Sequence, residues 1–194
     1  MAVARLPYVD PADASPPVRE ALEAVPPLNV FRTMAHAETA FRPWLRWAGT
    51  LLGELELDPA LRELAILYVS RLTPHAEYEW VQHVPIARAV GVTDAQISAL
   101  EHGDPVAASF GPLEHAVLRF TREVVRDARA SDEAFVAVRE ALSPREIVEL
   151  LMVIGQYMML ALVMATVEME LDEPAATAVI DASGAVVDRS DQAS

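Results

Sequence analysis

The chain has 194 residues, of which 53% are hydrophobic, so a single domain with a sizeable buried core is expected. It carries 29 acidic and 15 basic residues, which give a formal net charge of −14 at pH 7. This acidity argues against nucleic-acid binding, in which basic side chains replace the counterions of the phosphates, and against attraction to an anionic membrane surface.

Two residue types are absent from the sequence. Without cysteine, the chain has no disulfide, no thiolate nucleophile and no cysteine-ligated metal. Lysine is missing as well, because all 15 basic residues are arginine, so Schiff-base chemistry and a P-loop lysine are excluded. Residues 1–8 lack the pattern of a signal peptide, and we expect a cytoplasmic protein.

Prolines and capping residues divide the chain into helices, and no strand pattern is evident before residue 175. Asp58-Pro59 and Thr73-Pro74 each combine a capping residue with a proline at the first helical position. Thr93 and Ser143 each begin a capping box. The expected helices span residues 15–24, 28–35, 38–52, 58–72, 73–90, a short stretch after 93, 111–128, 131–142 and 143–171.

Residues 150–167 carry no charge, and their length is at the threshold for a membrane-spanning helix. The run contains Gly155 and Gln156, has acidic flanks and lacks Lys or Trp anchors, so we predict no membrane span. An all-round apolar helix is typical of a central helix buried by its own domain or by a partner subunit, which predicts more than a monomer. Residues 178–187 fit a small hairpin around Ser183-Gly184.

The segment 74–83 holds the densest set of reactive side chains. On a helix, Glu79 and His83 are four residues apart and share a face, so they can touch. A carboxylate beside an imidazole fixes the tautomer of the ring, which is the usual arrangement of an acid–base pair. The alternative is an ordinary surface pair, with Glu77 and Glu79 stabilising the N-terminal end of the helix dipole.

Glu63 is a second candidate for acid–base chemistry. It is flanked by Ile66 and Leu67 on the side of its helix opposite the main apolar stripe, so its carboxylate is expected to be partly desolvated. The alternative is a structural salt bridge to Arg62 or Arg71. Glu79 and His83 could supply two metal ligands, but no clear third and fourth ligand follows, and we predict no metal.

Several stretches resemble the carboxymuconolactone decarboxylase family, which includes the alkylhydroperoxidase D-like proteins. The first three are Leu61-Arg-Glu-Leu-Ala-Ile-Leu67, Glu77-Tyr-Glu-Trp-Val-Gln-His83 and Ile86-Ala-Arg-Ala-Val-Gly91. The resemblance continues through residues 118–123, 142–150 and 154–161, and it covers roughly residues 25–172.

The resemblance implies an all-α, alkylhydroperoxidase D-like helical domain with a long buried C-terminal helix. It also implies a homo-oligomer: a dimer, trimer or hexamer. The expected organisation is an N-terminal arm at 1–27, the helical domain at 28–172 and a C-terminal tail or small hairpin at 173–194.

The peroxidase branch of the family carries Cys-x-x-Cys followed by a histidine. His83 matches that histidine, whereas Ala76 and Glu79 stand at the two cysteine positions. Both sulfurs are missing, so thiol peroxidase activity is not expected. The acidic residue upstream in the proton relay of this branch corresponds most nearly to Glu63.

The decarboxylase branch uses neither a metal nor an organic cofactor, and none is expected here. By this resemblance His83 is the proton donor, tuned by Glu79, and Glu63 or Glu77 is the second acid or base. An arginine, Arg62 or Arg71, would clamp the substrate carboxylate. The expected substrate-binding residues are Arg62, Arg71, Trp80, Tyr78 and Tyr157.

These inferences predict an enzyme: a cofactor-independent acid–base lyase, similar to the decarboxylases. Its substrate would be a small carboxylated lactone or enolisable ring acid, transformed by decarboxylation or by a related isomerisation or cyclisation. The alternative is a non-catalytic, oligomeric ligand-binding paralogue with the same fold. The enzyme hypothesis requires Glu63, Glu79 and His83 to converge.

Overall fold

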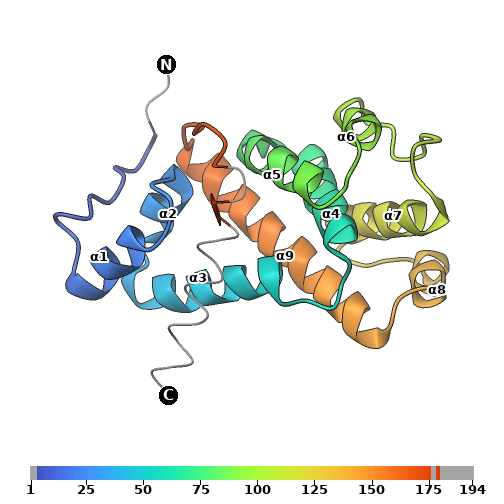
Figure 1. Ribbon diagram of the computed structural model, residues 1–194, viewed down its shortest axis with the longest axis horizontal. Helices are drawn as coiled ribbons and strands as arrows, with labels where there is room; N and C mark the ends of the chain where they lie inside the picture. Colours follow the sequence, from blue (N-terminus) through green and yellow to red (C-terminus); the bar gives the residue numbers. More distant parts are fainter. Residues whose placement is uncertain (1–3, 176–177, 180–194) are drawn as a thin grey trace. The chain divides into compact units, whose positions relative to one another are not determined.

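The computed structural model describes residues 4–175, 178 and 179, and all of the longer regular elements in this part of the chain are α-helices (Figure 1). The predicted all-α class is therefore confirmed. In chain order the helices are α1 (Pro16–Glu23), α2 (Asn29–Met34), α3 (Glu38–Gly53), α4 (Pro59–Leu72), α5 (Glu77–Ala89), α6 (Asp94–Glu101), α7 (Pro112–Asp127), α8 (Asp132–Arg139) and α9 (Pro144–Val167).

The chain forms two compact units. Residues 55–165 make one unit, which contains α4 to α8 and nearly all of α9. The described residues before 55 and after 165 make the other, in which α1 packs against α3. The boundaries of these units differ from those expected from the sequence for the arm, the helical domain and the tail. The expected boundaries stay predictions.

The predicted capping residues begin the helices as expected. The Asp58 carboxylate accepts hydrogen bonds from the amides of Ala60 and Leu61 at the start of α4, at 2.8 and 3.1 Å. Thr93 forms a complete capping box with Gln96 at the start of α6. Before α9, the Glu146 carboxylate accepts from the Ser143 amide at 2.8 Å, and the Ser143 hydroxyl accepts from the Glu146 amide at 3.2 Å. Local side-chain chemistry thus determines where these helices begin.

The predicted start of a helix at Thr73-Pro74 is wrong. Thr73 ends α4 in an extended conformation, with φ −100° and ψ 121°. His75 then adopts a left-handed conformation with φ +64°, which a helix cannot contain, so α5 begins only at Glu77. The reactive part of the segment still lies on one helix, because α5 continues through Pro85.

The C-terminal helix is shorter than predicted. It ends at Val167 rather than near residue 171, because Glu168 adopts a left-handed φ of +53°. The hairpin expected around Ser183-Gly184 lies outside the described residues.

Helix α4 is the centre of the 55–165 unit. It packs against α5, α6 and α7, and every residue from Leu61 to Ser70 is buried. The core that forms around it combines apolar side chains of four helices and the loops between them: Leu64, Leu67, Tyr68, Trp80, Ala87, Val92, Ile97, Leu100, Phe110 and Leu118. A helix surrounded in this way carries any polar side chain into the interior, which is where Arg62 and Glu63 lie.

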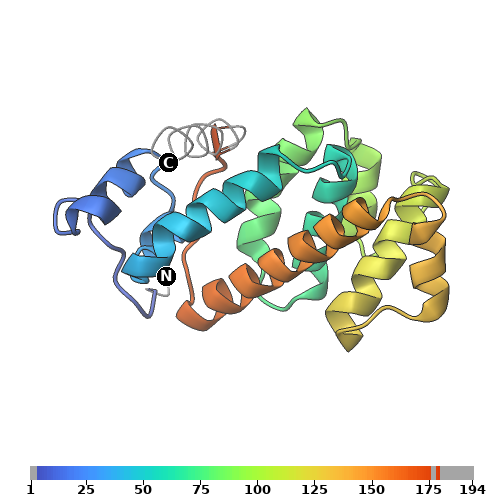
Figure 2. The same ribbon diagram turned by 90° about the horizontal axis from the view of Figure 1, so that it is seen from below.

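Figure 2 shows α9 as one uninterrupted helix. By length and composition alone it could cross a membrane, although core helices of soluble proteins pass the same test. One side of this helix is exposed: Val148, Leu151, Met152 and Leu162 retain 39–66% of their accessible surface. Their spacing places these four side chains on one face of α9.

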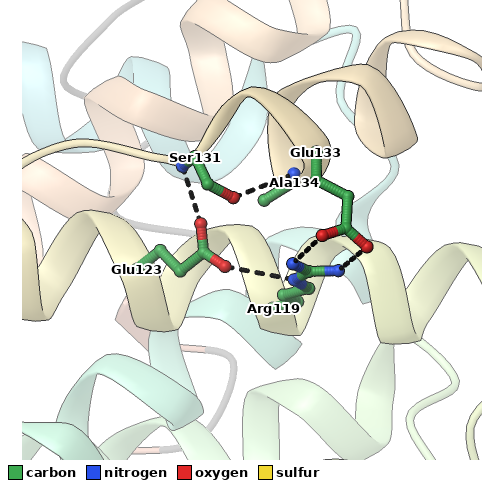
Figure 3. Close-up of polar contacts among 5 residues, drawn as sticks. All are labelled: Arg119, Glu123, Ser131, Glu133 and Ala134. Atoms are coloured by element: carbon green, nitrogen blue, oxygen red, sulfur yellow. Dashed lines mark hydrogen bonds and ion pairs between the residues drawn. The ribbon is translucent and has the colours of Figure 1, made fainter.

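A network of hydrogen bonds and ion pairs joins α7 to α8 and to the turn between them (Figure 3). Arg119 donates to both oxygens of Glu133, at 2.8 and 2.9 Å, and to Glu123 at 3.1 Å. The Ser131 amide donates to Glu123 at 2.7 Å. This hydrogen bond, aided by Arg119, lowers the pKa of Glu123 to about 2. Glu133 is exposed, and Arg119 and Glu123 are partly exposed, so each bond contributes little to stability and mainly fixes the turn between the helices.

A buried carboxylate joins the start of α9 to the loop before α4. Glu149 accepts a hydrogen bond from the Leu57 amide at 2.8 Å and from Arg145 at 2.8 Å. Burial alone would raise the pKa of Glu149, but these donors outweigh it and hold the pKa below its usual value.

We predict that Glu149→Ala lowers the free energy of unfolding by about 1–3 kcal/mol, because the buried Leu57 amide loses its acceptor. Urea unfolding followed by circular dichroism measures the change. Glu140→Ala, at an exposed position, is the control and should change stability little. Equal effects of the two substitutions would contradict this role of Glu149.

Candidate functional site

The site centres on a contact between α4 and α5. Glu63 of α4 is completely buried, and its Oε2 lies 2.8 Å from Nδ1 of His83 on α5. His83 is itself 7% exposed. A carboxylate at Nδ1 favours the tautomer that carries its proton there, which leaves Nε2 as the basic nitrogen. The pair is therefore oriented for proton transfer through Nε2.

Arg62 holds the other oxygen of this carboxylate. Its Nε donates to Oε1 of Glu63 at 3.0 Å, and Arg62 is 3% exposed. A buried carboxylate needs compensating donors, and here a guanidinium and an imidazole supply them on different oxygens. Arg62 thus fixes the orientation of Glu63, which in turn fixes the His83 ring.

Tyr157 brings α9 into the same cluster. Its ring meets the His83 ring edge-on, with centroids 4.8 Å apart and planes at 90°. Burial raises the pKa of Tyr157 well above its usual value; the charge of Glu63 adds to this, Arg62 opposes it and Glu79 adds further. The phenol therefore stays protonated, and residues from three helices meet at His83.

Glu79 does not pair with His83 as the sequence suggested. It is 3% exposed, and neither of its carboxylate oxygens has a hydrogen-bond partner in the described part of the chain. Burial raises the pKa of Glu79 to about 8, with only its own backbone amide acting in the opposite direction. A carboxyl group in this state is neutral at pH 7, which makes it a proton donor rather than a partner for a cation.

A second grouping forms at the N-terminal end of α5. The Arg71 guanidinium lies 4.2 Å from the centroid of the Trp80 ring and donates to Glu77 at 3.1 Å. The Glu77 side chain is 60% exposed, whereas Nε of Arg71 is buried and has no partner among the described residues. Tyr78 is buried as well. Catalysis by Glu77 and substrate binding by these neighbours stay predictions.

The sequence identified the residues of the cluster but not their pairing. Helical spacing pointed to Glu79 as the partner of His83, whereas the partner that contacts the ring is Glu63, 20 residues earlier on the packed helix. Only the packing of α4 against α5 determines this contact.

Among residues 4–175, 178 and 179, no group of three His, Asp or Glu side chains is arranged to hold a metal ion. Glu79 and His83, considered above as two possible metal ligands, are therefore not part of such a group in the described residues.

Comparison with protein families finds a match over residues 38–123 to the Carboxymuconolactone decarboxylase family. The matched segment includes Glu63, Glu79 and His83. No curated protein matches the chain.

Solved structures with a similar fold include the following two. One is the alkylhydroperoxidase AhpD core of an uncharacterized peroxidase-related protein from Ralstonia eutropha JMP134, with a TM-score of 0.77, 19% identity, and coverage of 93% of this chain and 98% of that one. The other is a variant of the debrominase Bmp8 in complex with 2,3,4-tribromopyrrole, with a TM-score of 0.65, 16% identity, and coverage of 97% of both chains. The expected alkylhydroperoxidase D-like fold is thereby confirmed.

The raised pKa of Glu79 predicts a specific dependence of stability on pH. Between its ordinary pKa of 4.5 and about 8, the folded chain keeps a proton on Glu79 that the unfolded chain releases. Stability therefore falls as pH rises through this window, by up to about 1.4 kcal/mol per pH unit from this group. In Glu79→Gln this contribution to the slope disappears.

Urea unfolding across that pH window measures the slope for each variant. Glu101→Gln, at an exposed position, is the control and should keep the slope of the unsubstituted chain. A Glu79→Gln slope equal to that of the control would show that Glu79 is ionised when buried.

Proposed function

We propose that this chain, which matches the carboxymuconolactone decarboxylase family over residues 38–123, is an acid–base lyase that works without a metal or organic cofactor. Its substrate class is a small carboxylated lactone or enolisable ring acid. The observation that carries the proposal is the buried contact of 2.8 Å between Glu63 and His83, with Arg62 on the other carboxylate oxygen.

The proposed reaction needs one group that can give a proton to carbon. The bond between the ring carbon and the carboxylate breaks, CO2 leaves, and the electron pair moves onto the neighbouring carbonyl as an enolate. Protonated His83 then delivers a proton from Nε2 to the carbon and regains one from solvent. Glu63 stabilises the imidazolium, and Arg62 keeps Glu63 in place.

Arg71 is the better candidate for the substrate clamp. Arg62 already donates to Glu63 inside the unit, whereas Arg71 has a buried Nε–H that no described residue accepts. Its guanidinium is also held over the Trp80 ring, which limits the entropy lost when it binds a carboxylate. Tyr78, Trp80 and Tyr157 complete the proposed binding residues.

The same scaffold does not support thiol peroxidase chemistry. The chain has no cysteine, and the positions that match the two thiols of the peroxidase branch hold Ala76 and Glu79. The proposal therefore assigns proton transfer, and no redox step, to His83. A cytoplasmic location is part of the same proposal.

We also propose that the protein is a homo-oligomer that buries the exposed face of α9. This face carries Val148, Leu151, Met152 and Leu162, and Leu162 keeps 66% of its surface. An apolar face of this length is unusual on a monomer in water. Nothing within 4 Å would meet a Cβ added at Gly155, so another helix has room to approach there.

His83→Ala should lower the rate of CO2 release from an accepted carboxylated lactone or 3-oxo acid by about 10²–10⁴-fold, since the proton donor is lost. Glu63→Gln should act in the same direction, because the imidazolium loses its counter-charge. A panel of such acids, assayed for CO2, provides the measurement.

His102→Ala, at an exposed histidine of the chain, is the matched control. Full turnover by His83→Ala would remove His83 from the mechanism. Saturable binding of panel compounds with no CO2 release by the unsubstituted protein would support the ligand-binding alternative instead.

Leu162→Glu should shift the protein to a smaller species in light scattering coupled to size exclusion, because a charge is placed in the proposed interface. Val136→Glu is the control: Val136 is 53% exposed on helix α8. A monomer in the unsubstituted protein would contradict this assembly, and so would an oligomer that both variants retain.

A further inference from the structure

Three buried carboxyl groups of the 55–165 unit differ in their partners. Glu63 has Arg62 and His83, and Glu149 has the Leu57 amide and Arg145. Glu79 is buried to the same degree but lacks any hydrogen-bond partner among the described residues. Glu79 therefore differs from the other two in having unused donor and acceptor capacity.

The unpartnered carboxyl group of Glu79 lies near His83, the proposed proton donor. Glu79 and His83 lie one turn apart on α5, on the same face of the helix. Tyr157 of α9 contacts the His83 ring, and both Glu63 and Glu79 help to raise the pKa of Tyr157. The carboxyl group is therefore close to the cluster without belonging to its hydrogen-bond network.

The surroundings of Glu79 favour its neutral form. The ionisable groups around the cluster are His83 on the same helix, Tyr157 on α9, and Arg62 and Glu63 on α4. The guanidinium of this set, on Arg62, already donates to Glu63, and the His83 ring contacts the same carboxylate. Burial consequently raises the pKa of Glu79 to about 8, and no charged partner counteracts it.

From this geometry we propose that Glu79 acts as a neutral carboxylic acid that donates a hydrogen bond to the carbonyl oxygen of the substrate. This role rests on the proposed lyase function and deepens it. A neutral acid in an apolar setting can stabilise an enolate oxygen because it donates a strong hydrogen bond without bringing a negative charge.

In this mechanism Glu79 and His83 act on different atoms of the substrate. As the carboxylate leaves as CO2, the electron pair of the broken bond moves to the carbonyl oxygen, and the O–H of Glu79 strengthens its hydrogen bond to that oxygen. Protonated His83 then delivers its proton to carbon, the electron pair returns to the new C–H bond, and Glu79 keeps its own proton. Glu79 thus stabilises the enolate oxygen, and His83 protonates the carbon.

This role implies a substrate class. The group facing Glu79 must be an oxygen that gains negative charge during the reaction. A 3-oxo acid provides one, and so does an unsaturated lactone whose carboxylate is on a saturated carbon from which the released electron pair can delocalise through the double bond onto the ring carbonyl. A cationic ligand, such as an amine, would instead require Glu79 to ionise.

Infrared difference spectroscopy of the full-length protein tests the neutral acid without any turnover. At pH 7 we expect a carbonyl-stretch band of a protonated carboxyl group that is lost in Glu79→Gln and retained in Glu101→Gln, an exposed control. Absence of the band, or its persistence in Glu79→Gln, would overturn the proposal.

Salicylate and benzoate then test the hydrogen bond to an oxygen. Both carry a ring carboxylate for the proposed arginine clamp, but only salicylate adds a neighbouring phenolic oxygen that resembles an enol. At saturating concentration we expect salicylate to move the Glu79 band to lower frequency and benzoate to leave it in place. No shift with salicylate, or equal shifts with both, would overturn the proposed contact.

Kinetics on a substrate from the panel separate this role from general binding. Glu79→Leu should lower kcat by about 10²–10³-fold with KM little changed, and Glu79→Gln should retain more activity because an amide still donates. Equal loss in both variants would indicate a carboxylate base and overturn the proposal. If no panel acid is decarboxylated, the lyase function fails, while the spectroscopic results still decide the state and contact of Glu79.

Discussion

The arrangement of α4 and α5 in the 55–165 unit depends on the buried carboxylate of Glu63. Glu63 lies on α4, the helix against which α5, α6 and α7 pack. An ionised carboxylate at this buried position is unfavourable unless hydrogen-bond donors surround it. Arg62 and His83 supply those donors from two directions. Removing either would leave a buried charge only partly compensated, so the positions of α4 and α5 and the orientation of the imidazole are linked.

This constraint separates the roles of the carboxyl groups. Glu63 is held by Arg62 and His83, and Glu149 is held by a backbone amide and Arg145, so both have compensating donors. Glu79 occupies an equally buried position with no such donor among the described residues, and burial then favours its protonated form. A buried glutamate can thus act as the counter-charge of an imidazolium (Glu63), link a helix to a loop (Glu149) or remain a neutral acid (Glu79), depending on the hydrogen-bond donors around it.

The sequence predicted the features that short-range chemistry determines. Capping residues and prolines predicted the starts of α4, α6 and α9, and the two predictions that failed, at Thr73-Pro74 and near residue 171, failed because His75 and Glu168 adopt left-handed conformations that propensity does not indicate. Glu63 and His83 were identified as candidates, but their contact could not be, because it joins residues 20 positions apart through helix packing.

The neutral carboxyl group of Glu79 can lie beside the Glu63–His83 pair because it adds no charge to the buried cluster. A thiolate or carboxylate anion at position 79 would place a second negative charge near that of Glu63. The guanidinium of Arg62, which donates to Glu63, already compensates the first charge. A neutral acid adds none, so it can stand close to His83 without lowering the stability of the pair. It gains a negatively charged hydrogen-bond acceptor when the substrate carbonyl becomes an enolate, and its hydrogen bond strengthens at that moment. The interaction is therefore stronger in the transition state than with the bound substrate, which is the condition for it to accelerate the reaction.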